Sequence, residues 1–506
     1  MTVQCKIIPG DNLFKFPLFL LIAVFFFSCS ASLNMEDFSP YHKIAPAGLK
    51  EDAVLLKKIL DADHPSLYWY TPKDSIDEYF NETINGIHDS LTEMQFRSKL
   101  SWAVAKIRCG HTSVRSSKEY VQYFNTHRMV QFPLDIKVWG DSMVVIYNYI
   151  KRDTVFKRGT VITSVNGMPA GMMIDSMFQF ISTDGYADNF KDQLLSIYFP
   201  LFYNLSFGLR DSNVITYIDK QGLEKTGVLY NYRPVRDTSK NQQLNIAIPK
   251  LTRRQIRAAK KRNGNNLSFD SANTARLQLV TFSGGGLRRL FKKSFEQIQD
   301  KHVTNLIIDL RANSGGNIGA CANLTKYLIQ QPFTIADSVS SVTHRLKYGR
   351  YIHPALIYKI LMFVSAKKKK DGRYHFGYLE HHTFYPKKSL HFNGNIYIIQ
   401  GGFTFSAASM FVSHLKGQRN VTVIGEETGG GNYGNSSVHL PSVILPNSHV
   451  QVVLPVYRIV NDAKRQKDGK GITPDIYVPP SSEAIRLGID PKMQKVEELI
   501  KERKKI

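Results

Sequence analysis

Cysteine is scarce in this chain, with four residues among 506. Cys5 and Cys29 lie in or beside an N-terminal apolar segment, while Cys109 and Cys321 stand far apart from each other. This distribution excludes a disulfide framework, and the last two cysteines lack the spacing of a metal site. Small buried thiols are common core residues, so we expect Cys109 and Cys321 to be structural. We predict no metal and no cofactor.

Acidic residues are also few. Aspartate and glutamate total 42 against 66 lysines and arginines, which gives a formal net charge of +24. The basic residues are scattered over the chain, and no RNA- or DNA-binding module accompanies them, so we exclude nucleic acid as a partner. Anionic lipid surfaces or acidic substrates fit this charge better, but the charge alone does not select between them.

The apolar run near the start of the chain, Phe16–Phe27, is shorter than the roughly 20 residues that a membrane-spanning helix needs. Two lysines precede it and small polar residues follow it, as in a secretory signal. The sequence Phe26–Cys29 resembles a bacterial lipobox, which implies cleavage before Cys29 and a lipid anchor on it. We therefore expect residues 1–28 to be a signal peptide and the protein to lie in the cell envelope. An ordinary cleaved signal with an incidental cysteine is the alternative.

The length predicts two to three domains. Apolar positions recur with helical period in the first part of the chain and then alternate as in strands. The segment Lys157–Gly167 resembles a hairpin of PDZ domains, which bind extended peptides at a sheet edge. A β subdomain without a peptide groove is the alternative. The expected division is a helical domain 36–130, a PDZ-like domain 131–232, a basic linker 233–270, a catalytic domain 271–490 with an insertion 345–392, and a basic C-terminal tail 491–506.

The insertion contains an apolar helix, Ala355–Val364, followed by the four lysines Lys367–Lys370. Such a helix could lie on anionic lipid head groups. More often it covers a core or forms a dimer contact, which is the interpretation we favour.

Two motifs in the C-terminal half point to acyl transfer. The apolar strand Val303–Leu310 ends in a loop with Gly315 and Gly316, whose free amides could hold a carbonyl oxygen. The strand Asn395–Gln400 is followed by a loop that delivers Ser406 to the start of a helix.

In that helix, expected over Ser406–Leu415, the Ala407 amide would supply a second oxyanion donor, supported by the helix dipole. The alternative is structural: Ser406 caps the helix, and the two glycines Gly315 and Gly316 only form a turn.

Together the motifs resemble the serine peptidases of the C-terminal-processing (tail-specific) and tricorn-core family. The resemblance extends over Leu277–Val478 and includes the closing sequence Gly471–Ile476. It implies an α/β multidomain protein whose catalytic domain is a crotonase-like ββα superhelix, with Ser406 as the nucleophile.

The same resemblance bears on the catalytic base. Tail-specific members use a lysine in the loop that matches Glu427–Gly431, but this chain has Gly431 there and no lysine between Lys416 and Lys464. Tricorn-type members use an N-terminal histidine, and Ala105–Thr112 resembles that stretch, so His111 is the expected general base.

The tricorn arrangement also orients its histidine through a serine and a glutamate. The serine position is Gly110 here, and the glutamate position is Asp468. Asp468 could reach the base by way of Thr112 or Ser113, or it could be a solvated turn carboxylate among lysines.

These residues predict a serine-type endopeptidase of the cell envelope that cleaves polypeptides through an acyl-enzyme on Ser406. Two alternatives remain: a non-catalytic peptide-binding protein of the same fold, and a serine esterase or amidase. The oligomeric state is not predicted.

Overall fold

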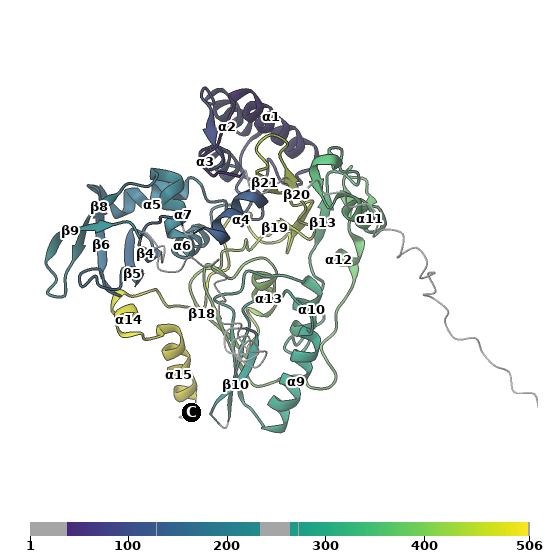
Figure 1. The fold of residues 1–506 in the computed structure, drawn as a ribbon. Helices are drawn as coiled ribbons and strands as arrows, with labels where there is room; N and C mark the ends of the chain where they lie inside the picture. Colours follow the sequence, from purple (N-terminus) through teal and green to yellow (C-terminus); the bar gives the residue numbers. More distant parts are fainter. Residues whose placement is uncertain (1–37, 128, 233–263, 272, 504–506) are drawn as a thin grey trace, which may run out of the picture.

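The fold is given by a computed structural model, which describes residues 38–127, 129–232, 264–271 and 273–503 (Figure 1). It is a mixed α/β multidomain fold. The predicted signal peptide, the lipidation site Cys29 and most of the predicted linker lie outside the described residues. Within the described ranges, no helix has both the length and the apolar character needed to cross a membrane.

The N-terminal part of the described chain is mainly helical. The longest helix buries Leu49, Leu56 and Leu60 on one face, and α3 begins with a capping box between Thr92 and Gln95. The elements are β1 (Lys43–Ile44), α1 (Pro46–Asp63), α2 (Lys73–Asn85), β2 (Leu91–Thr92), α3 (Glu93–Ala105), β3 (Val114–Arg115) and α4 (Lys118–Thr126).

The second unit is an antiparallel sheet with three helices. Its strands lie in the order β4-β5-β6-β8-β9, with the short β7 on β6, and its core is separate from that of the rest of the chain. The elements are β4 (Leu134–Trp139), β5 (Ser142–Asn148), β6 (Val161–Val165), β7 (Met168–Pro169), α5 (Ala170–Phe178), α6 (Asp188–Ile197), α7 (Phe199–Phe207), β8 (Ser212–Ile218) and β9 (Glu224–Tyr230).

The third unit is built on a six-stranded sheet in the order β10-β11-β12-β17-β18-β23. All neighbours after β10 pair in parallel, which places the carboxyl ends of β12 and β17 at one edge. The predicted linker is too long at its C-terminal end, because residues 266–271 form β10, which pairs with β11. The strands are β10 (Asn266–Ser271), β11 (Thr274–Gln278), β12 (Asn305–Asp309), β17 (Asn395–Gln400), β18 (Val421–Gly425) and β23 (Ile476–Tyr477).

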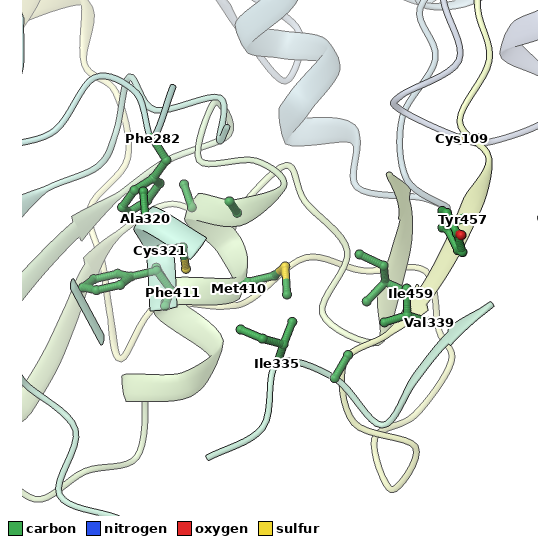
Figure 2. Packing of buried hydrophobic residues seen from close by; sticks show 14 of the residues in the cluster. Cys109, Phe282, Ala320, Cys321, Ile335, Val339, Met410, Phe411, Tyr457 and Ile459 are labelled. Carbon is green, nitrogen blue, oxygen red and sulfur yellow. The ribbon is translucent and has the colours of Figure 1, made fainter. Parts of the chain in front are cut away.

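Helices α9 (Leu287–Asp300), α10 (Ile318–Thr325) and α13 (Ala407–Leu415) accompany this sheet. Figure 2 shows Met410 and Phe411 of α13 beside Cys321 of α10, with Phe282 above them. The α13 helix is buried along almost its whole length. Dense packing of this kind holds the first turn of α13 in one position.

A second group of strands joins distant parts of the chain. The insertion contributes β15 and β16 to the sheet β15-β16-β13-β22-β19, and β3 of the N-terminal domain pairs with β21. The elements are β13 (Ser338–Ser341), η4 (Gly349–Tyr351), β14 (Ile352–His353), α11 (Ala355–Ser365), β15 (Lys367–Lys368), β16 (Tyr374–His375), α12 (Gly377–His381), β19 (Gly434–Ser437), β20 (Ser442–Ile444), β21 (Gln451–Val453) and β22 (Tyr457–Val460).

The predicted C-terminal tail is wrong as a description of residues 491–503. After α14 (Ser482–Leu487), these residues form α15 (Pro491–Arg503). Met493, Val496 and Ile500 recur at helical spacing and pack against a cluster on the parallel sheet that includes Tyr397. The many charges of this segment concealed that stripe in the sequence, and two of them, Lys492 and Arg503, contact Glu426 and Asn395 at the sheet.

Candidate active site

Ser406 stands at the junction of β17 and α13 and has an unusual backbone. Its φ of 54° and ψ of −124° lie in a region that residues with a side chain rarely adopt. The helix itself starts at Ala407, one residue later than predicted. Strain of this size persists only where the surroundings impose it, and it is concentrated at functional sites.

The side chain of Ser406 does not serve the helix. It makes no capping hydrogen bond to α13, and within the described residues its hydroxyl has no other hydrogen bond. Its carbonyl is held instead, since the Ser409 hydroxyl and the Met410 amide both donate to it, at 2.8 and 3.0 Å. The structural alternative for Ser406, a helix cap, is therefore wrong, and the hydroxyl is left available for chemistry.

The glycine loop after β12 packs directly against this serine. Gly315 has a φ of 100°, and a Cβ atom there would lie 2.7 Å from the Ser406 Cβ. The Gly315 amide donates to the Asn313 side chain at 2.8 Å, which fixes the turn. Only glycine combines this conformation with such a close approach.

Two amides beside Ser406 remain without an acceptor. In the part of the chain that the structure describes, neither the Gly316 nor the Ala407 N–H donates a hydrogen bond. Ala407 is the first residue of α13, where amides have no partner within the helix. The structure thus leaves two free donors on the segments that flank the serine.

His111 comes to the same place from the turn after α3. Its ring lies against the ring of Phe405, the neighbour of Ser406, with centroids 4.6 Å apart. Its side chain is only 7% exposed. Burial lowers the pKa of His111 to about 3, so the imidazole is neutral at physiological pH.

A buried carboxylate that the sequence did not point to lies beside this histidine. Oδ1 of Asp184 is 4.0 Å from Nδ1 of His111, beyond hydrogen-bond distance, and Nδ1 has no hydrogen-bond partner in the structure. Asp184 accepts from the Gly110 amide at 2.9 Å and from the Gly431 amide at 3.5 Å. Burial nevertheless raises the pKa of Asp184 to about 7.

No local motif marks Asp184, because it belongs to an irregular loop between α5 and α6 and meets His111 only through tertiary structure. Its only sequence signal is an acidic residue next to a glycine.

The structure does not bring Asp468 to the base. Among the described residues, the only hydrogen bond of Asp468 is with the Lys470 amide, at 2.9 Å in an exposed turn. The route through Thr112 is also closed, since the Thr112 hydroxyl is buried and bonded to Nε2 of His64 at 2.8 Å. The structure thus places Asp184, and not Asp468, beside His111.

Gly431 and Gly110 stand where tail-specific members have a lysine and tricorn-type members have a serine, and neither position has room for a side chain. A Cβ atom at Gly431 would lie 2.4 Å from the Gly434 carbonyl oxygen. A Cβ atom at Gly110 would lie 2.7 Å from the ring of Phe405. Neither a lysine at the first position nor a serine at the second fits this geometry without movement.

The two described cysteines are free and buried. Burial raises the pKa of Cys109 to about 11 and that of Cys321 to about 12. Both thiols are therefore protonated at neutral pH and are poor nucleophiles.

Comparison with known proteins agrees with this arrangement. The model of peptidase family S41 matches residues 273–478, which contain Ser406 and the glycine loop. A solved structure of mature CPAF complexed with lactacystin is similar, with a TM-score of 0.60 at 13% identity over 90% of this chain and 97% of that one. Mature CPAF alone gives a TM-score of 0.58 at 13% identity over 87% and 94%. No curated protein sequence matches the chain.

The fold of this chain is therefore shared with CPAF across nearly the whole of both proteins. At 13% identity the structural similarity to CPAF supports a shared fold and nothing further. The match to the family model also supports a peptidase function. Residues 273–478 thus match the model of peptidase family S41, and the described chain has a mixed α/β multidomain fold similar to that of CPAF.

Proposed function

We propose that this protein is a serine-type endopeptidase of the cell envelope, anchored through a lipid on Cys29, in which Ser406 attacks the peptide carbonyl and His111 is the general base. The observation that carries the proposal is the strained, unbonded Ser406, with a free amide at Ala407 and another in the adjoining glycine loop, and with the buried His111 packed on its neighbour Phe405. This is the set of groups that acyl transfer requires.

In the first step, neutral His111 takes the proton of the Ser406 hydroxyl as the oxygen bonds to the carbonyl carbon. Since Nδ1 faces Asp184, Nε2 is the ring nitrogen left for this task. The oxyanion that forms accepts hydrogen bonds from the Gly316 and Ala407 amides. The imidazolium then gives its proton to the leaving amine, and water repeats the sequence to release the acyl group.

Asp184 would act as a positioning residue. Ionised, it stabilises the positive charge that His111 acquires in the transition state, across a distance that can shorten once the ring is protonated. Backbone amides of Gly110 and Gly431 hold it in place, so a glycine before the histidine replaces the serine of the tricorn arrangement. This supports a base held by a buried carboxylate without a linking hydroxyl.

The closed space at Gly431 supports a histidine rather than a lysine as the base. His111 is neutral at the pH at which a lysine with its ordinary pKa would be protonated. The crotonase-like superhelix and the PDZ-like role of the β4–β9 unit remain predictions from the family resemblance. A peptide-binding role for that unit would place substrate near the catalytic domain.

The test is hydrolysis of an unfolded protein by the chain from Cys29 to Ile506 carrying Cys29→Ser. This chain keeps every described element and cannot be lipidated at position 29. Ser406→Ala and His111→Ala should each abolish turnover. Ser90→Ala and His88→Ala, at exposed positions, are the matched controls and should retain it. A fluorophosphonate should label Ser406 in the parent.

Turnover that survives Ser406→Ala would overturn the proposal. Cleavage of activated esters without any cleavage of polypeptides would favour the esterase alternative. Absence of both activities and of labelling would favour a non-catalytic binding protein.

A further inference from the structure

The helix α11 is attached to the protein by a narrow stripe. Met362 is fully buried, the Tyr358 ring lies 5.5 Å from that of His439, and the Ser365 hydroxyl lies 3.1 Å from that of Tyr457. Tyr358, Met362 and Ser365 are spaced by four and three residues, so they form one face of the helix. The rest of the helix points away from the core, at the periphery of the molecule (Figure 1).

The outward face is apolar. Phe363 and Val364 are 74% and 75% exposed, values typical of lysine rather than of core residues. The exposed apolar side chains of this one helix are Leu356, Ile357, Ile360, Leu361, Phe363 and Val364.

The exposed face of α9 differs from that of α11. The outward face of α9 carries Arg288, Arg289, Lys292 and Lys293, all exposed. The solvent-facing side of α9 is thus charged, whereas that of α11 is apolar. A contiguous apolar patch on a folded protein marks a surface that meets another apolar phase.

Lysines border the apolar face. Lys367, Lys368 and Lys370 follow the helix directly, and all three are exposed. None of them forms an ion pair among the described residues, whereas Lys369 is bonded to Glu380 at 2.7 Å. Lys359 adds a further exposed charge within the helix. The apolar patch thus adjoins unneutralised positive charge.

We propose that α11 with Lys367, Lys368 and Lys370, the α11 surface, docks on an anionic lipid bilayer. With 11 residues and a length of about 16 Å, the helix would lie in the plane of the interface rather than cross it. The six apolar side chains would enter the boundary of head groups and acyl chains. The lysines would bind the anionic head groups.

Charge decides between this occupant and a second copy of the chain. A twofold contact would pair the α11 surface with itself, and since this surface contains no acidic side chain, neither copy would neutralise the lysines of the other. Like charges in a desolvated contact repel. A bilayer with anionic lipids supplies an apolar phase for the exposed apolar side chains of α11 and negative charge for the lysines.

The experiment is sedimentation with large unilamellar vesicles of phosphatidylcholine, alone or with 30% phosphatidylglycerol, using the Cys29→Ser chain from Cys29 to Ile506. The parent should bind the anionic vesicles and be released by salt. Ile360→Asp with Phe363→Asp should lower the partition coefficient at least tenfold at an unchanged melting temperature. The triple change Lys367→Gln, Lys368→Gln and Lys370→Gln should remove most of the salt dependence.

The matched control is Leu223→Asp with Val228→Asp, two side chains that are 60% and 55% exposed elsewhere on the surface. It should bind vesicles as the parent does. The proposal is overturned if the parent does not bind anionic vesicles, or if the α11 variants bind as well as the control. It is also overturned if the parent is a dimer that the α11 variants dissociate without any change in vesicle binding.

Discussion

A Cβ atom at position 315 would lie 2.7 Å from the Cβ of Ser406 and 3.0 Å from the Ala407 amide nitrogen. The glycine loop and the serine are therefore in contact with no room for a methyl group. This contact sets the position of the free amides relative to the hydroxyl, and it makes the loop sensitive to the smallest substitution.

Gly315→Ala should reduce kcat/KM by at least about 100-fold, the loss typical of a displaced oxyanion donor. The positive φ and the clash should also destabilise the fold by about 1–3 kcal/mol. Gly285→Ala is the matched control, because a Cβ there meets nothing within 4 Å. Turnover of Gly315→Ala equal to that of the control would contradict the assignment of the oxyanion site.

The strain at Ser406 should be measurable as stability. Ser406→Gly and Ser406→Ala both remove the hydroxyl, but only glycine adopts a φ of 54° with a ψ of −124° without strain. We expect the glycine variant to have a free energy of unfolding about 1 kcal/mol higher than the alanine variant, by urea denaturation. Equal or lower stability would show that the protein environment does not strain this residue.

Asp184 should give a pH dependence of known sign. Its pKa is raised in the folded state from 3.8 to about 7, so the folded chain holds a proton that the unfolded chain loses between these values. The contribution of Asp184 to stability is therefore most favourable near pH 4 and is lost as pH rises to 7. At pH 8 the titration of Asp184 makes the free energy of unfolding as much as about 4 kcal/mol lower than at low pH.

Asp184→Asn removes this titration. Its free energy of unfolding relative to the parent should rise between pH 4 and pH 8, while Asp188→Asn, at a mostly exposed carboxylate, should show a flat difference. Because only ionised Asp184 assists His111, the kcat/KM of the parent should rise with an apparent pKa near 7. The kcat/KM of Asp184→Asn should be much lower than that of the parent and should not rise with pH in this range.

Asp468 provides the opposite test. Its carboxylate bonds to a neighbouring amide in an exposed turn and does not touch His111, so Asp468→Asn should keep kcat/KM within about twofold of the parent. A loss comparable to that of Asp184→Asn, at an unchanged melting temperature, would restore the assignment made from the sequence.

The C-terminal helix should contribute to the stability of the catalytic domain. Val496 is fully buried in the cluster on the parallel sheet, so Val496→Ala should lower the free energy of unfolding by about 2 kcal/mol. The neighbouring exposed Glu497→Ala should change it by less than about 0.5 kcal/mol. Equal effects of the two changes would mean that α15 is not docked in solution.

The parts of the site that depend on local sequence were predictable. The strand Asn395–Gln400 matches β17 residue for residue, and the glycine loop after β12 and the start of α13 lie within one or two residues of their predicted places. Each is a continuous apolar run ended by glycine or serine, so the pattern states where the element stops.

The parts that depend on tertiary contacts were not. Asp184 meets His111 through the packing of three separate segments, and its own loop has no pattern that marks a site. The α15 helix was mistaken for a tail, because charged residues dominate its composition while Val496 and Ile500 carry the packing. The resemblance placed the acid arm at Asp468 by position in the chain, and chain position does not report distance in space.

The pairing of β3 with β21 has a consequence for truncated chains. The strand Val114–Arg115, three residues after His111, pairs with Gln451–Val453, which follows Ser406 in the chain. The segment that carries His111 is therefore anchored to a part of the chain that lies beyond Ser406 in the sequence. A chain that ended before Gln451 would contain both His111 and Ser406 but would lack the strand with which β3 pairs.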